Sequence, residues 1–225
     1  MIPVYVVTGL LGSGKTTLIN VELRERKKLG STEIISFETG NTEFIKSPLS
    51  IEPDDIEENL HHVVQQIQDY LSTTTPKEIW VEWNGMFSFQ QLERIFFNSI
   101  LKEFCHLERV IYTANSNSIT SMIQALGDRV VSQLYSADYI MLYANDTTQT
   151  KAVKKLLQSY NPECSILVNP TTKDIHNKLT KPIWPWSLYS IVAILTLYIL
   201  LVTVFRHSIS YSIHQVLAIA SGIIF

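Results

Sequence analysis

The 225-residue sequence is poor in cysteine and has no excess of positive charge. Two cysteines, Cys105 and Cys164, are too few for a disulfide framework and indicate a chain of the reducing cytosol with both thiols in its core. The formal net charge of −3 leaves no basic surface, so nucleic acid is not an expected partner. Residues 1–3 lack the basic start and the cleavage site of a signal peptide, and we expect no leader to be removed there.

The most informative feature of the sequence is a phosphate-binding motif near its start. Residues 9–16, GLLGSGKT, fit the pattern G-x-x-x-x-G-K-[ST]. The β-branched and aromatic residues 4–7 predict a strand before it, and the apolar spacing in residues 17–28 predicts a helix after it. Because a phosphate loop lies between a strand and a helix, the sequence predicts a nucleoside-triphosphate site here.

The side chains and backbone of this loop have separate expected roles. Glycines let the backbone N–H groups surround the phosphates, and the helix N-terminus adds partial positive charge. Lys15 is expected to reach the β and γ phosphates, and the Thr16 hydroxyl to hold Mg²⁺. The expected nucleotide-binding residues of the loop are Gly9, Gly12, Ser13, Gly14, Lys15, Thr16 and Thr17.

Strand-like and helix-like segments alternate after the loop. The expected strands cover residues 34–37, 79–81, 110–112, 139–142 and 165–168, and the expected helices 54–70, 89–100 and 148–160. This alternation predicts an α/β fold over residues 1–170, with a mostly parallel sheet flanked by helices. Ligands of such sheets collect at the carboxyl ends of the strands.

Acidic residues follow two of these strands. Glu38 comes after the second strand, and Glu82 and Gly85 come after the third. Phosphate-loop NTPases place there the acid that holds Mg²⁺ or its water and the glycine that senses the γ-phosphate. Glu82 is therefore the leading Mg²⁺ ligand beside Thr16. The alternative is a solvated carboxylate at a strand end.

The composition changes after residue 170. Residues 171–182 have the composition of a polar linker, and residues 183–205 carry no charge over 23 positions, which is long enough for a membrane-spanning helix. A buried core helix is the alternative. Three lysines precede this segment and only Arg206 follows it, so the positive-inside bias places the nucleotide domain on the cytoplasmic side of the cell membrane.

The last segment, residues 209–225, is apolar but shorter. It is either a second membrane span or an amphipathic helix at the interface. A fragment of a longer membrane protein is a third interpretation of this ending.

These motifs together resemble the CobW, HypB and UreG group of metal-handling P-loop GTPases, and CobW-like members most closely, over about residues 2–170. Residues 7–18 look like the family's extended phosphate loop, residues 38–40 like its Glu-Phe-Gly switch, and residues 81–85 like its third motif with Glu in place of Asp. Residues 136–142 match the family's Ala-Asp step into a strand, and Asn161-Pro162 match its Asn-Pro pair before the last strand.

Two departures from the family pattern bear on function. Residues 143–146, Tyr-Ala-Asn-Asp, stand where the family reads guanine with Asn-Lys-x-Asp, and only Asp146 remains. An Asp carboxylate accepts two hydrogen bonds from guanine, so a weakened GTP preference is expected, with ATP as an alternative ligand. The family's Cys-x-Cys-Cys metal motif is absent from residues 46–51, so Mg²⁺ is the metal expected.

The resemblance, together with the uncharged segment 183–205, predicts a membrane-anchored GTP-binding protein that hydrolyses GTP slowly with Mg²⁺ and acts as a nucleotide switch. Its implied catalytic residues are Lys15, Glu38 and Glu82, with Gly85 and Asp146 as further nucleotide contacts. The apolar segment predicts the membrane as a partner, with an integral membrane permease or a metal-handling protein as a further partner. The resemblance implies a second copy of the chain. The alternative function is a non-hydrolysing nucleotide-sensing or scaffold subunit of a membrane transport complex.

Overall fold

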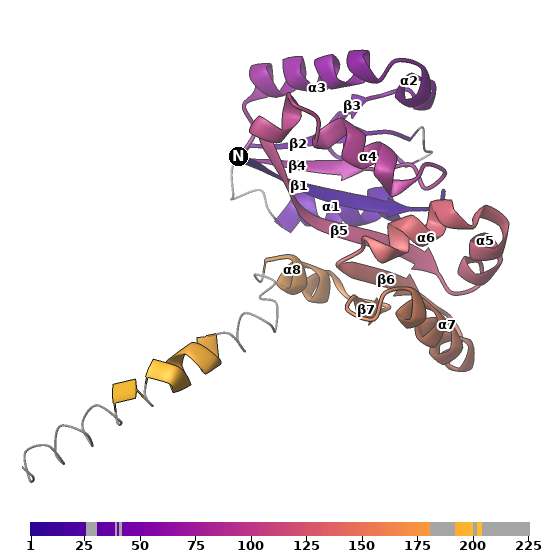
Figure 1. Cartoon of the computed structure of the whole chain (residues 1–225). Coiled ribbons are helices and arrows are strands. Elements are labelled where there is room, and N and C mark those ends of the chain that lie inside the picture. Colours follow the sequence, from indigo (N-terminus) through magenta and orange to yellow (C-terminus); the bar gives the residue numbers. More distant parts are fainter. Residues whose placement is uncertain (26–30, 39, 41, 181–191, 200–201, 204–225) are drawn as a thin grey trace, which may run out of the picture. The chain divides into compact units, whose positions relative to one another are not determined.

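The computed structural model describes residues 1–25, 31–38, 40, 42–180, 192–199 and 202–203. The chain divides into two compact units, Met1–Thr180 and Lys181–Phe225. The first unit contains a seven-stranded parallel sheet in the order β3-β2-β4-β1-β5-β6-β7 (Figure 1). Its strands are β1 (Ile2–Gly9), β2 (Thr32–Ser36), β3 (Leu49–Ser50), β4 (Glu78–Glu82), β5 (Cys105–Asn115), β6 (Tyr139–Tyr143) and β7 (Ser165–Val168).

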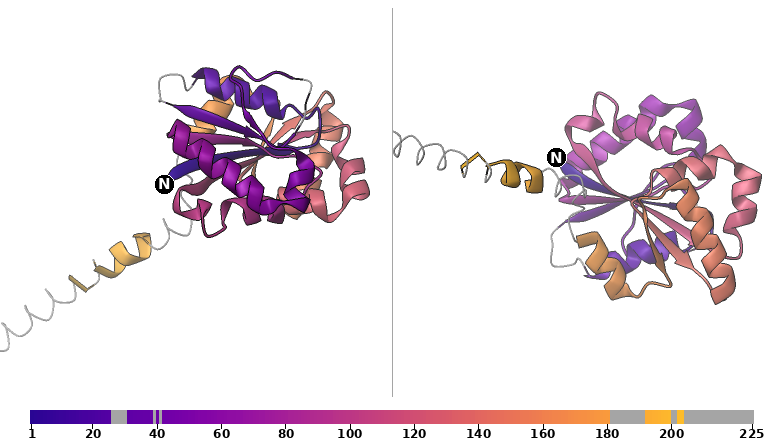
Figure 2. Two further views of the ribbon diagram at one scale, coloured as in Figure 1. Left: turned by 90° about the horizontal axis from the view of Figure 1, so that it is seen from above. Right: turned by 60° about the horizontal axis from the view of Figure 1, so that its bottom comes forward.

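Helices cover both faces of this sheet (Figure 2). They are α1 (Lys15–Glu25), α2 (Pro53–Glu58), α3 (Leu60–Thr74), α4 (Phe89–Phe96), the 3₁₀ helix η2 (Leu101–Glu103), α5 (Ile119–Leu126), α6 (Asp128–Tyr135), α7 (Thr147–Tyr160) and α8 (Thr172–Thr180). The predicted α/β fold with a parallel sheet flanked by helices is thereby confirmed. The helix predicted over residues 54–70 is divided into α2 and α3 at Asn59, whose φ of −146° is not helical.

The central strand shows why the sheet is buried on both faces. Val4 and Val6 of β1 pack into the core beneath α2 to α7, whereas Tyr5 and Val7 pack into the core beneath α1 and α8. Successive side chains of a strand point to opposite faces, so a strand covered on both sides needs a continuous apolar run. Both cysteines are buried, as the sequence predicted, and burial raises the pKa of each thiol to about 11.

The polar linker predicted over residues 171–182 is wrong for most of its length, because residues 172–180 form α8. Thr171 and Asp174 bond reciprocally at its start: the Thr171 N–H donates to Asp174 Oδ2 at 3.0 Å, and the Asp174 N–H donates to Thr171 Oγ1 at 3.3 Å. This is a helix-capping pattern. Ile175 and Leu179, four residues apart, are buried in the same core as α1. The first unit therefore continues to Thr180.

The membrane span predicted over residues 183–205 lies mostly outside the described residues. Residues 192–199 and 202–203 are helical. Within the part of the chain that the structure describes, no helix is both long enough and apolar enough to cross a membrane. The second span or interfacial helix predicted over residues 209–225 lies wholly outside the described residues.

The docking of α8 on α1 generates a stability prediction. Ile175→Ala removes a side chain that is 4% exposed, and we expect the free energy of unfolding to fall by about 2–4 kcal/mol. Chemical denaturation of the wild type and the variant measures the change. Lys173→Ala, on the exposed side of the same helix, is the control and should change stability by less than about 0.5 kcal/mol. Equal small losses in both variants would show that α8 is not part of the folded unit.

Candidate functional site

The loop between β1 and α1 depends on glycine for its shape. Gly9, Gly12 and Gly14 have φ angles of 136°, 73° and 97°, which other residues rarely adopt. A Cβ atom on Gly9 would lie 2.3 Å from the carbonyl oxygen of Thr113, so this position also has no room for a side chain. The glycines of the phosphate motif are therefore required by the observed backbone.

The loop that follows β4 lies directly against the phosphate loop. A Cβ atom on Gly85 would lie 2.3 Å from the Gly9 carbonyl oxygen, so only glycine permits this approach. The Trp83 N–H donates to the Val7 carbonyl at 2.8 Å and extends the pairing of β4 with β1. Trp83 itself is buried and makes an edge contact with Phe37, with ring centroids 4.9 Å apart.

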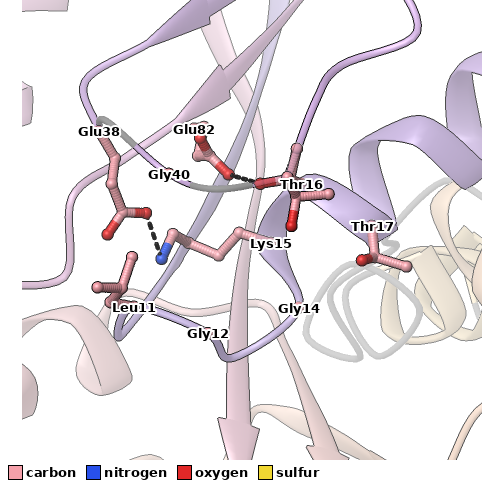
Figure 3. A pocket seen from close by; sticks show the side chains of 10 residues that line it. Leu11, Gly12, Gly14, Lys15, Thr16, Thr17, Glu38, Gly40 and Glu82 are labelled. Atoms are coloured by element: carbon pink, nitrogen blue, oxygen red, sulfur yellow. Dashed lines mark hydrogen bonds and ion pairs between the residues drawn. The ribbon is translucent and has the colours of Figure 1, made fainter.

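The Lys15 ammonium lies at the centre of the site (Figure 3). Its Nζ donates to the carbonyls of Gly9 and Leu10 at 2.8 and 2.9 Å, and forms an ion pair with Glu38 Oε2 at 2.6 Å. The two side chains of this pair are 2% and 9% exposed. Because an unpaired buried charge is strongly unfavourable, the Glu38 carboxylate supplies the anion that Lys15 requires.

The Glu82 carboxylate accepts two hydroxyl hydrogen bonds. Thr16 Oγ1 donates to its Oε1 at 2.5 Å, and Ser36 Oγ donates to its Oε2 at 3.0 Å. Burial raises the pKa of Glu82 above its ordinary value; the hydroxyl donors and Lys15 partly oppose this effect, and the charge of Glu38 adds to it. Glu82 is thus a buried acid and not the solvated strand-end carboxylate of the alternative interpretation.

One pocket joins these groups (Figure 3). Its lining residues are Leu11, Gly12, Gly14, Lys15, Thr16, Thr17, Glu38, Gly40, Thr42 and Glu82. The sequence singled out most of these positions but missed Leu11, Gly40 and Thr42 as lining residues. Gly9 and Gly85 contact each other beneath the loop and do not line this pocket.

The sequence predicts Ser13 as a nucleotide-binding residue, but Ser13 does not line this pocket. Its hydroxyl lies 2.6 Å from the Thr113 hydroxyl, and Thr113 Oγ1 in turn donates to the Thr8 carbonyl at 3.2 Å. These bonds attach the phosphate loop to β5. No local pattern predicts this contact, because the two residues are 100 positions apart in the sequence.

The end of β6 lies beside the phosphate loop, and the segment that follows it carries Asp146. A Cβ atom on Gly14 would lie 3.5 Å from the Tyr143 ring, which places Tyr143 against the loop. Asn169 holds the backbone of Ala144, accepting from its N–H at 2.8 Å and donating to its carbonyl at 2.7 Å. The exposed Asp146 caps α7 by accepting from the Thr148 N–H at 2.8 Å. Its role in reading a base stays a prediction.

Comparison with known proteins assigns this arrangement to a family. The nucleotide-binding domain of CobW/HypB/UreG matches residues 3–168. The chain belongs to this family. No curated protein matches the sequence of this CobW-family chain.

Solved structures are similar to this CobW-family chain in fold. The Zn(II)-bound YjiA GTPase from E. coli is 18% identical, with a TM-score of 0.51 over 82% of this chain and 67% of that chain. A Zn(II)-bound triple mutant of YjiA GTPase has the same identity and coverage with a TM-score of 0.56. HypB from Archaeoglobus fulgidus is 11% identical, with a TM-score of 0.46 over 79% of this chain and 87% of that chain. At 18% identity, the similarity to the two YjiA structures shows the fold alone.

The donors of this CobW-family site fit a magnesium nucleotide. Mg²⁺ prefers oxygen ligands, and the Thr16 hydroxyl and the Glu82 carboxylate lie together beside the Lys15 ammonium. Among the described residues, no group of three or more His, Cys, Asp or Glu side chains is placed to hold a metal ion by itself. His61 and His62 are exposed on α3.

The ion pair between Lys15 and Glu38 generates a binding prediction for this CobW-family chain. A phosphate that binds Lys15 would displace the Glu38 carboxylate from it, and a neutral side chain is easier to displace than a carboxylate. We expect Glu38→Gln to bind nucleoside triphosphate about tenfold more tightly, equivalent to about 1.4 kcal/mol. Titration calorimetry measures the dissociation constant, with Lys15→Ala as the variant that loses binding. Weaker binding by Glu38→Gln would show that Glu38 assists the nucleotide and does not compete with it.

The raised pKa of Glu82 generates a pH prediction. The neutral form is favoured in the folded state, so ionisation of Glu82 costs stability as the pH rises through its folded pKa, which lies above the ordinary 4.5. Mg²⁺ requires the ionised form. We expect the Mg²⁺-dependent gain in nucleotide affinity to fall on acidification while ordinary glutamates are still charged, and Glu82→Gln to abolish that gain at all pH values. Calorimetry with and without Mg²⁺ across pH measures both, and an unchanged gain in Glu82→Gln would contradict the assignment.

Proposed function

We propose that this protein is a nucleotide switch that binds GTP together with Mg²⁺ and hydrolyses it slowly. The observation that carries the proposal is the convergence of the Lys15 ammonium, the Thr16 hydroxyl and the Glu82 carboxylate on one pocket beside a glycine-shaped loop. Membership of the CobW/HypB/UreG nucleotide-binding family supports it.

Each residue of the pocket has a defined part in this proposal. When bound, Mg²⁺ would neutralise phosphate charge, held by Thr16 and Glu82 directly or through water. Lys15 stabilises the negative charge of the β and γ phosphates. Backbone N–H groups of the phosphate loop and of the first turn of α1, which begins at Lys15, would bind the phosphate oxygens.

The switch in this proposal is the segment after β2 that carries Glu38. Its start is held by the Phe37 N–H, which donates to the Glu82 carbonyl at 2.9 Å. Its far end is held by Asn20 of α1, which donates to the Glu43 carbonyl at 3.0 Å and accepts from the Ile45 N–H at 2.9 Å. Exchange of Glu38 for phosphate at Lys15 would therefore move a short segment between two fixed points.

The membrane attachment of the switch is part of the same proposal. Residues 183–205 contain 23 consecutive uncharged residues, with lysines before them, which supports anchoring with the nucleotide domain on the cytoplasmic side. A membrane permease, a metal-handling protein or a second copy is the proposed partner. Extraction of the full chain from cell membranes by detergent and not by high salt would support anchoring. Release by salt alone would contradict it.

The base preference is tested by exchanging one carboxylate. An Asn at position 146 offers the amide donor that the 2-oxo group of xanthine requires, so we expect Asp146→Asn to shift preference from GTP toward XTP by about tenfold or more. Titration calorimetry of GTP, ATP and XTP with Mg²⁺ on residues 1–180, the compact unit, measures it. Equal binding of GTP and ATP by the wild type would contradict guanine recognition and show that the site binds purines in general. Tight binding without turnover would favour the nucleotide-sensing scaffold subunit.

A further inference from the structure

A buried amide on α6 connects two parts of the site without lining it. Gln133 is fully buried, and its Oε1 accepts a hydrogen bond from the Thr8 hydroxyl. Its Nε2 donates to the Gly85 carbonyl at 3.0 Å and to the Phe87 carbonyl at 2.6 Å. Carbonyl oxygens only accept hydrogen bonds, so the amide nitrogen must face the two carbonyls and the orientation of the side chain is fixed.

The partners of Gln133 lie at the base of the phosphate loop. Thr8 directly precedes Gly9, and the backbone of Gly85 lies on that of Gly9 so closely that a Cβ atom would be 2.3 Å from the Gly9 carbonyl oxygen. Gln133 therefore joins the end of β1 to the segment that follows Glu82. Loss of the amide N–H groups leaves the Gly85 and Phe87 carbonyls without their donor, which favours a shift of residues 83–87 away from the phosphate loop.

We propose that Gln133 is a positioning residue that fixes residues 83–87 against the phosphate loop and so sets the preference of the site for a nucleoside triphosphate over a diphosphate. The inference rests on the proposed function. Gln133 acts through the Gly85 backbone, which does not itself line the pocket but packs on Gly9 and Leu10 of the phosphate loop and follows Glu82, which does line it. This segment is the one at which the γ-phosphate is expected. Displacement of that backbone weakens triphosphate binding and leaves the contacts of a diphosphate with Lys15 and Thr16 in place.

A second buried amide provides a matched control. Asn161 Nδ2 donates to the carbonyls of Leu134, Tyr135 and Ala137 at 3.0, 2.9 and 2.8 Å, at the end of the same helix α6. None of these residues lines the nucleotide pocket. Gln133→Glu and Asn161→Asp make the same change, placing a carboxyl oxygen where an amide nitrogen faced backbone carbonyls. Both are expected to lower stability.

The test measures two affinities for the full chain with Mg²⁺. Dissociation constants for GDP and for a non-hydrolysable GTP analogue are obtained by calorimetry, beside the free energy of unfolding. We expect Gln133→Glu to reduce the ratio of GDP to analogue dissociation constants about tenfold, the effect of losing a buried hydrogen bond. Asn161→Asp should keep the ratio within about twofold of the wild type while losing stability.

Thr8→Val keeps the proposal testable if Gln133→Glu does not fold. It removes one hydroxyl bond to Gln133 and preserves the shape of the side chain, and a ratio about threefold below that of the wild type is expected. An unchanged ratio in folded Gln133→Glu or in Thr8→Val overturns the proposal for Gln133 alone. A wild-type chain that binds neither nucleotide overturns the proposed function together with it.

Discussion

A buried ammonium group is the constraint on which the site depends. Lys15 is 3% exposed, and a cation at that depth requires an anion and aligned carbonyls around it. The glycine-shaped loop supplies two carbonyls, and Glu38 supplies the carboxylate. A phosphate is the natural replacement for that carboxylate because it brings the same sign of charge to the same place. The Lys15 ion pair therefore links the nucleotide pocket to the conformation of the segment after β2.

The parallel sheet brings the other groups to this cation. β4 and β1 are neighbours, so Glu82 ends beside the start of α1 and meets the Thr16 hydroxyl. Because these strands are neighbours, the backbone of Gly85 also packs directly on the backbone of Gly9, and no side chain fits between them. Buried polar side chains from β5 and α6, Thr113 and Gln133, then hold this end of β1. The strand order thus determines which functional side chains lie together at the pocket. Buried hydrogen bonds then fix the backbone segments that carry those side chains.

The sequence predicted the parts of this structure that local patterns specify. The apolar runs predicted every strand of the sheet except the two-residue β3, and the phosphate motif predicted the loop, Lys15 and Thr16 at the site. Gln133 left no local signal, because its partners Thr8 and Gly85 lie 125 and 48 residues away. Helix α8 was missed because its polar composition outweighed Ile175 and Leu179, although the Thr171 and Asp174 spacing is a capping signal. Asp146 shows a further limit, since a motif position does not reveal that its carboxylate caps α7.

The Lys15 ion pair is best tested by the structure of the protein with Mg²⁺ and a non-hydrolysable GTP analogue. We expect Lys15 Nζ within about 3 Å of a phosphate oxygen, the Glu38 carboxylate released from it, and Glu82 and Thr16 beside the metal ion. Retention of the ion pair between Lys15 and Glu38 in a protein saturated with the nucleotide would contradict this expectation. The phosphates would then be bound elsewhere, and Glu38 would not be the group that the nucleotide displaces.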